Sequence, residues 1–186
     1  MKSATHHWSG RVGAALVVVA DDTITTVDTA RHTMTVERDG QVVRTDRIEM
    51  DVDGSSTEIP ELIGRQLADI DFLLPNDDDL TYCLIELDAG SLQFLLDNID
   101  KFADPMARTL CWSTAWEMTR AGTMRARDFI RLVARGMKAE TELAVLERIV
   151  SQASTALKNY ADPAWAKDST VLAQALVDGA RSTDAQ

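Results

Sequence analysis

Cysteine is scarce in this sequence. Its 186 residues include only two cysteines, Cys83 and Cys111, each in an apolar context and neither in a C-x-x-C spacing. Two such thiols do not provide the disulfide framework of a small secreted domain, and they lack the spacing of a zinc or redox motif. We expect both to be buried, reduced thiols of a cytoplasmic protein.

Basic residues are also few. The sequence has 19 Lys and Arg against 30 Asp and Glu, which gives a formal net charge of −11. Binding to nucleic acid requires a clustered excess of Lys and Arg, and attachment to an anionic membrane surface requires the same. We therefore expect neither nucleic acid nor a membrane as a partner. At 45% hydrophobic and 26% charged residues, the composition is that of a globular protein.

Long apolar runs are absent. No segment approaches the roughly 18 apolar residues that a membrane-spanning helix requires. The run "VGAALVVVA", residues 12–20, follows Lys2 and Arg11 and so imitates a short secretory signal. Its β-branched residues and its continuation as "DDTITTV" predict a strand instead, which agrees with a cytoplasmic location.

The common catalytic motifs are missing as well. The sequence contains no H-E-x-x-H zinc helix, no G-x-S-x-G nucleophile elbow and no glycine-rich phosphate loop. Three histidines, His6, His7 and His32, bring no obvious third ligand for a zinc ion. A nucleophile system assembled from distant residues stays open, because one sequence does not exclude it.

The first half of the chain, to about residue 83, has the pattern of short strands separated by turns. Val36 and Val42 flank Arg38-Asp39-Gly40-Gln41, whose Asp-Gly dipeptide is typical of a hairpin turn. The apolar positions after the turn are Val43, Ile48, Met50 and Val52. This spacing predicts a small antiparallel sheet or sandwich.

From about residue 88 the apolar period becomes helical. Asp88 precedes one helical repeat, and an Asp-Pro pair begins two more stretches, at Asp104-Pro105 and Asp162-Pro163. Aspartate at the N-cap followed by proline is a strong start signal, since the proline ring fixes φ where its missing N–H would have no partner. We expect a helix to begin at each of the three places.

Two more helices are predicted between the Asp-Pro pairs. The first has an apolar face of Phe129, Val133 and Met137. The second carries a seam at spacings of 3, 4, 3, 4 and 3, formed by Leu143, Leu146, Val150, Ala153, Leu157 and Tyr160. Because the seam is shorter than three heptads, we favour an antiparallel helix hairpin over a coiled-coil dimer. A last helix over residues 164–177 and a frayed tail complete a predicted helical solenoid.

Three consecutive aspartates, Asp77, Asp78 and Asp79, form an acidic cluster. Carboxylate oxygens suit a hard cation. However, adjacent side chains in an extended segment point alternately to opposite faces, so these three do not converge on one ion. Pro75-Asn76 ends the apolar run before them, and "LIEL" (84–87) follows. We interpret the cluster as a solvated turn that enters a strand at the domain junction.

Other candidates are interpreted as core. Trp112 and Trp116 lie four residues apart on one predicted helix and could line a peptide groove, but core packing is the favoured interpretation. Cys111, between Leu110 and Trp112, is interpreted in the same way. No residue of the chain is therefore assigned a catalytic, cofactor-binding or metal-binding role.

Several segments together resemble a known family. They are "NDDDLTY", the run from "LDAGSLQFLLDNIDKFADP" to "RARDFI", and "QASTALKNYADPAWA". These segments are similar to the C-terminal part of actinobacterial aminopeptidase N, a zinc metallo-aminopeptidase family of the gluzincin type. Upstream, "VVRTDRIEMDVDGSSTEIPEL" resembles the small β-sandwich that follows the catalytic domain in those enzymes. The resemblance extends from about Gln41 to Lys167.

The resemblance implies an α+β architecture. Residues 1–83 would form a small antiparallel β-sandwich, abbreviated at its start, and residues 84–186 the first helices of a HEAT-like superhelix. In the family these helices form a cup that limits peptide access to the active site. The zinc-binding and N-terminus-binding motifs belong upstream. The chain is thus expected to be a non-catalytic C-terminal fragment whose partner is the parent catalytic domain, with zinc in the parent alone.

Two other functions stay open. The helices could form a standalone binding module with a concave face for a peptide or protein. An unfamiliar enzyme using the acidic residues is a third hypothesis. The fragment interpretation also predicts self-association, because a severed helical array leaves apolar residues such as Trp165, Leu172 and Leu176 partly exposed.

Overall fold

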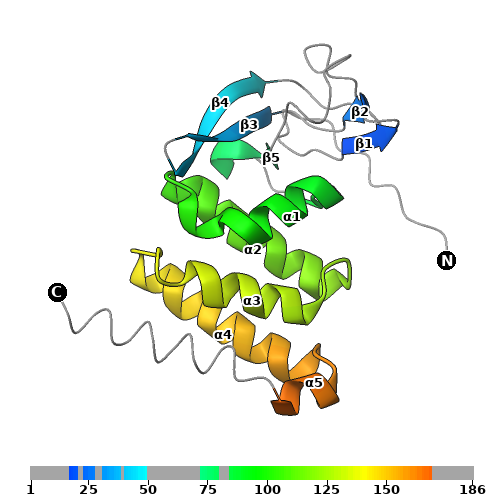
Figure 1. Cartoon of the computed structure of the whole chain (residues 1–186), viewed down its shortest axis with the longest axis vertical. Coiled ribbons are helices and arrows are strands. Elements are labelled where there is room, and N and C mark those ends of the chain that lie inside the picture. The colour runs from blue at the N-terminus through cyan, green and yellow to red at the C-terminus, as the bar shows by residue number, and fades with distance from the viewer. Residues whose placement is uncertain are drawn as a thin grey trace. The chain divides into compact units, whose positions relative to one another are not determined.

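The computed structural model describes residues 17–20, 23–27, 31–38, 40–49, 72–79 and 84–168. The chain divides into two compact units, residues 1–94 and residues 95–186 (Figure 1). Strands occupy the first unit, and most of the helices lie in the second. His6, His7, Cys83, Leu172 and Leu176 lie outside the described residues, as do the turn after residue 52 and the predicted frayed tail.

The strands of the first unit pair in antiparallel fashion. β1 (Val17–Ala20) pairs with β2 (Thr23–Val27). β3 (Arg31–Arg38) pairs with both β4 (Gln41–Glu49) and β5 (Phe72–Pro75), which gives a three-stranded sheet in the order β4-β3-β5. The antiparallel pairing expected for this half is present in the described strands, whereas a sandwich of two facing sheets stays a prediction.

The β3–β4 hairpin forms where the sequence predicts it. Arg38 pairs with Gln41 at its tip, and Gly40 has a φ of 79°. A positive φ at this position favours glycine because glycine has no Cβ to clash with the backbone. Asp39, the first residue of the predicted turn dipeptide, lies outside the described residues.

The pairing of β3 with β4 shifts at one place. Neighbouring residues of β3 pair with Asp46 and with Arg44, so Thr45 is an extra residue in β4. A bulge of this kind interrupts the alternation of faces along the strand. It explains how Val43 and Ile48, five residues apart, are both partly buried although a regular strand would place them on opposite faces.

The predicted strand over residues 84–87 is wrong. Residues 84–88 have no regular secondary structure. Ile85 and Leu87 are nevertheless buried, while Leu84 and Glu86 are exposed. Apolar and polar residues alternate there because every second side chain is buried, although the backbone does not pair with another strand. Helix α1 begins directly afterwards, at Ala89.

Five α-helices and a short 3-10 turn follow. They are α1 (Ala89–Asn98), η3 (Ile99–Lys101), α2 (Pro105–Ala121), α3 (Ala126–Gly136), α4 (Leu143–Asn159) and α5 (Pro163–Asp168). The three predicted helix starts are confirmed. Asp88 accepts a hydrogen bond from the Ser91 amide at 3.0 Å, and Asp104 and Asp162 likewise accept from backbone amides two residues on, at 2.8 and 2.7 Å. None of the described helices combines the length and the apolar character needed to cross a membrane.

The core of the second unit is formed by α2, α3 and α4, which succeed one another in Figure 1. Cys111 and Trp112 of α2 are buried, as are Phe129 and Val133 of α3. These positions confirm the core interpretation of Cys111 and the predicted apolar face of α3. Helix α2 ends at Gly122, whose φ of 81° completes its C-cap.

Trp112 lies directly against the end of α3. A Cβ atom added to Gly136 would meet Trp112 Cη2 at 2.6 Å and Ile99 Cγ2 at 2.9 Å. Distances under 3 Å are incompatible with an unchanged packing, so only glycine permits this approach. Because Gly136 has no side chain, the Trp112 indole can pack directly against the backbone of α3.

The predicted seam of α4 is wrong in phase. Its fully buried residues are Ile149, Ala153 and Ala156, each 0% exposed, and of these only Ala153 belongs to the predicted seam. Leu143, the first seam residue, is 68% exposed. The small side chains of the two alanines allow α4 to approach its neighbours closely, so the face that carries them is buried. The spacing of the large apolar residues does not predict this face.

Candidate functional site

The acidic turn at Asp77–Asp79 is a 3-10 turn that follows β5, as the turn interpretation predicts. Asp77, however, is not solvated. Its side chain is fully buried, and Arg44 Nη2 lies 2.8 Å from Oδ1 and 2.7 Å from Oδ2. Arg44 also lies 3.3 Å from Asp78 Oδ1. The prediction of a fully solvated turn is therefore wrong for Asp77, because a guanidinium from β4 compensates its buried charge.

Left-handed backbone conformations make this turn tight. Asn76, Asp78 and Asp79 have φ values of 52°, 67° and 51°. Asn and Asp tolerate this region better than other non-glycine residues, since their short polar side chains bond locally. Asn76 Nδ2 donates to Asp79 Oδ1 at 3.2 Å in this way. The aspartates therefore have a structural explanation in the turn itself.

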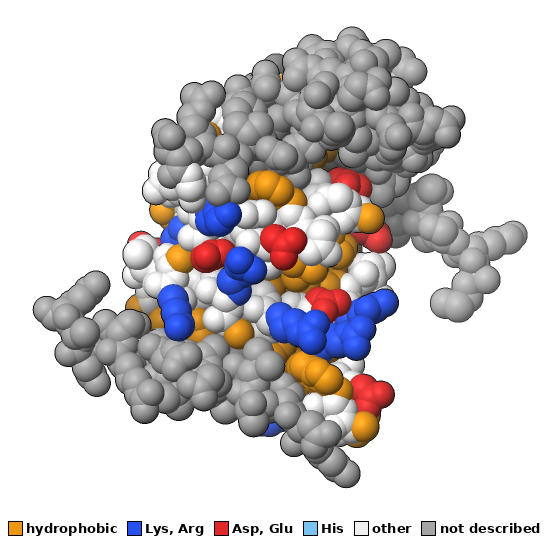
Figure 2. Space-filling model, viewed as in Figure 1, with side chains coloured by type: hydrophobic (Ala, Val, Ile, Leu, Met, Phe, Trp, Pro, Cys, Tyr) orange, Lys and Arg blue, Asp and Glu red, His pale blue; other side chains and the backbone are white. Residues whose placement is uncertain are grey.

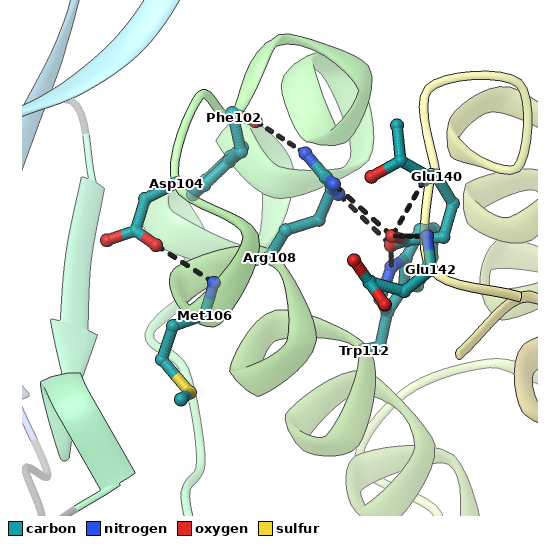
Figure 3. A network of polar contacts seen from close by, with 8 residues as sticks. Phe102, Asp104, Met106, Arg108, Trp112, Glu140 and Glu142 are labelled. Carbon is teal, nitrogen blue, oxygen red and sulfur yellow. Dashed lines mark hydrogen bonds and ion pairs between the residues drawn. The ribbon is translucent and has the colours of Figure 1, made fainter. Parts of the chain in front are cut away.

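A second polar cluster is buried in the helical unit and joins Arg108 to Glu140 (Figure 3). Arg108 Nε donates to Glu140 Oε2 at 3.0 Å and Nη2 donates to Oε1 at 3.2 Å. Arg108 Nη1 also donates to the Phe102 carbonyl at 2.9 Å. Trp112 Nε1 donates to Glu140 Oε2 at 3.1 Å. Each of the three nitrogens of the Arg108 guanidinium thus donates one hydrogen bond within this cluster.

The Glu140 carboxylate is held in its charged form. Burial by itself raises the pKa of this carboxyl, but hydrogen bonds from Arg108, the Glu142 amide and Trp112, with the charge of Arg108, bring its pKa below the usual value. Glu140 also accepts from the Thr141 amide at 3.0 Å. An ionised, fully bonded carboxylate has no free lone pair directed at a substrate, so the cluster is suited to holding the fold together.

The two tryptophans differ in their surroundings. Trp112 is 2% exposed, which confirms core packing for that residue. Trp116 is partly exposed and contacts Phe129 and Tyr160, with ring centroids 5.4 and 6.1 Å apart. These three rings extend from α2 across α3 to the end of α4 within the helical unit.

A surface pocket of about 520 Å³ lies beside the last of these rings. Its lining residues come from the start of α3 and from the α4–α5 turn, and they are Arg125, Ala126, Arg127, Tyr160, Ala161, Asp162, Ala164 and Trp165. Figure 2 shows basic side chains gathered at this end of α3 with apolar side chains directly beside them. No sequence motif predicts this pocket. The features that point to it are the two arginines at the start of α3 and the aromatic residues around the second Asp-Pro pair.

Metal-binding residues do not gather in the described part of the chain. No group of three or more His, Cys, Asp or Glu side chains there is arranged to hold an ion. The residues that the structure describes therefore do not fit a zinc site. The side chain of His32, in β3, is outside the described part.

Comparison with known proteins gives two findings. Residues 72–185 match the model of a family described as the ERAP1-like C-terminal domain. Over 124 residues the chain is 39% identical to aminopeptidase N of Streptomyces lividans. This alignment covers 67% of the chain but 14% of the relative, so the chain spans only a small part of the length of that enzyme.

Proposed function

This chain belongs to the family of ERAP1-like C-terminal domains, and from that membership we propose that it serves as a non-catalytic C-terminal part of an aminopeptidase. The observation that carries the proposal is the family match over residues 72–185, which includes β5 and all five described helices. The 39% identity to an aminopeptidase N supports the same parent class.

The proposed role is mechanical and steric. Residues 1–83 would form a small β-sandwich that supports the catalytic domain, and residues 84–186 would begin a HEAT-like lid that limits peptide access. The close packing of α2 on α3 and α4, with Gly136 against Trp112, supports this role, because closely packed helices resist deformation. Zinc would be held by the parent catalytic domain and not by residues of this chain. A cytoplasmic location is part of the same proposal.

Direct assay of the purified chain tests this role. We expect no release of N-terminal residues from aminoacyl amides or short peptides, with or without added zinc, because the chain would contribute no reacting group. The Streptomyces lividans aminopeptidase N, purified and assayed in parallel, provides the positive control. Zinc-dependent release that stays with the chain through two chromatographic steps would overturn the proposal.

A standalone binding module is the second candidate, and the association state of the chain distinguishes it from a piece of a larger protein. Leu143 is exposed, and Leu146, Val150 and Leu157 are only partly buried by described residues. An apolar stripe at helical spacing needs a partner. For a piece of a larger protein we expect self-association in light scattering, reduced by Leu143→Gln but not by the exposed control Ser113→Gln. A strictly monomeric chain would favour the standalone module instead.

A further inference from the structure

The pocket between the start of α3 and the α4–α5 turn has an uneven lining. Its lining combines two aromatic residues, Tyr160 and Trp165, with two basic residues, Arg125 and Arg127. A volume of about 520 Å³ falls within the range of small-molecule sites, roughly 300–1,000 Å³. The pocket lies entirely within the helical unit.

Its polar groups have spare bonding capacity. Within the described part of the chain, the Arg125 side chain has no hydrogen bond or ion pair, although this protein carries a net charge of −11. Arg127 has one distant ionic contact, 4.0 Å from Nε to Asp128 Oδ1. A guanidinium offers a planar fork of donors that matches carboxylate and phosphate oxygens.

One of the two aromatic residues of the lining, Tyr160, is packed against a neighbouring ring. Tyr160 packs edge-on against Trp116, with the two ring planes at 89°. Asp162, the carboxylate among the lining residues, is engaged as the cap of α5 through the amides of Ala164 and Trp165, at 2.7 and 3.4 Å. The lining then carries two guanidinium groups against this one carboxylate, so its net charge is positive and favours an anion.

We propose that this pocket binds a small anion carrying a flat apolar group, namely an aromatic carboxylate or an aromatic phosphate ester. The anion pairs with Arg125 and Arg127, and the ring packs between Tyr160 and Trp165. Stacking of a flat group on an aromatic face adds to burial. This role is separate from support of a catalytic domain, and the two can fail independently.

The test is a titration followed by the indole N–H signal of Trp165 in ¹⁵N-labelled full chain. Trp165→Phe assigns that signal among the four tryptophans of the sequence. The probes are 2-naphthoate and 2-naphthyl phosphate, with neutral 2-naphthamide and inorganic phosphate as controls. We expect both naphthyl anions to shift the Trp165 signal saturably, naphthamide to bind at least tenfold more weakly, and inorganic phosphate alone to leave the signal unmoved.

Charge variants identify the contact. Arg125→Gln and Arg127→Gln should each weaken binding of the naphthyl anions at least fivefold. Arg120→Gln, an exposed arginine of α2 that pairs with Glu117 outside the pocket, should leave it unchanged. All three positions are exposed, so the fold should survive, and an unchanged amide spectrum away from the site verifies this. Tighter binding of the carboxylate or of the phosphate then distinguishes the two ligand sources.

The proposal is overturned if neither naphthyl anion shifts the Trp165 signal by 10 mM. It is equally overturned if naphthamide binds as tightly as the anions, since the pocket would then be only an apolar hollow. Loss of binding in Arg120→Gln to the same extent as in Arg125→Gln would also contradict it, because the effect would be one of overall charge.

Discussion

Arg108 and Glu140 form a two-bonded ion pair inside the helical unit, with side chains 6% and 1% exposed. Arg108 lies in the first turns of α2, and Glu140 lies in the connection between α3 and α4. Through the additional bond to the Phe102 carbonyl, the pair fixes the segment before α2 as well. The pair therefore connects the start of α2 and the segment just before it to the α3–α4 connection, where Glu140 lies 32 residues further along the chain than Arg108.

Glu140→Gln should destabilise the helical unit by about 3 kcal/mol, because it leaves the buried Arg108 charge without its counter-charge. The measurement is urea unfolding followed by circular dichroism. Glu117→Gln is the matched control, since Glu117 pairs with Arg120 at the surface of α2. That exposed pair should contribute less than about 1 kcal/mol. Equal losses in the two variants would contradict the account.

The same pair makes stability depend on pH. Because the pKa of Glu140 is lowered in the folded state, its contribution is complete above the unfolded pKa of glutamate, about 4.3. The contribution is lost as pH falls through the lower folded pKa. The difference in unfolding free energy between the wild type and Glu140→Gln should therefore be constant from pH 7 to 5 and shrink as the pH falls below about 4.3, the unfolded pKa. A difference that grows on acidification would refute this.

Gly136→Ala should destabilise the chain by about 1–3 kcal/mol, since its Cβ would overlap the Trp112 ring and force repacking. Gly90→Ala is the control: it makes the same change at an exposed position of α1, where the nearest atom is Asp88 Oδ1 at 3.2 Å. There the higher helix propensity of alanine should offset any adjustment, leaving a change within about 1 kcal/mol. Thermal melts of the two variants make the comparison, and a tolerated Gly136→Ala would show that α3 can move away from the indole.

Asp77→Asn should weaken the first unit by about 1–2 kcal/mol, because it removes the charged partner of Arg44 at a buried position. Asp79→Asn should have little effect, since asparagine tolerates the same φ and keeps an oxygen for Asn76. Hydrogen exchange of the amides in β5 reports on this unit directly. Faster exchange in Asp79→Asn than in Asp77→Asn would show that Asp79, and not Asp77, contributes more to the stability of this unit.

Local signals predicted the helix starts and the β3–β4 hairpin. Asp88, Asp104 and Asp162 cap their helices through amides two or three residues away, so the information lies within a few positions of sequence. Gly40 determines the hairpin tip in the same manner. Such features need no knowledge of distant partners.

Features that depend on distant contacts were not predictable. The buried face of α4 is set by how closely Ala153 and Ala156 let other helices approach, which the spacing of large apolar residues does not reveal. Asp77 is buried only because Arg44 reaches it from β4. The sequence offers one indirect indication of the role of Glu140. Arg108 lies within an apolar helix and therefore requires a buried acceptor, but the sequence does not identify that acceptor.

The central claim is best tested by a graft into aminopeptidase N of Streptomyces lividans. The segment of that enzyme that matches this chain is deleted, or replaced by residues 72–185 of this chain, and cleavage of an aminoacyl p-nitroanilide and of a ten-residue peptide is measured. We predict that the deletion lowers activity or alters the preference between the two substrates, and that the graft restores the values of the intact enzyme. If the enzyme's own segment restores activity through the same junctions while the graft behaves like the deletion, the proposed supporting role is wrong.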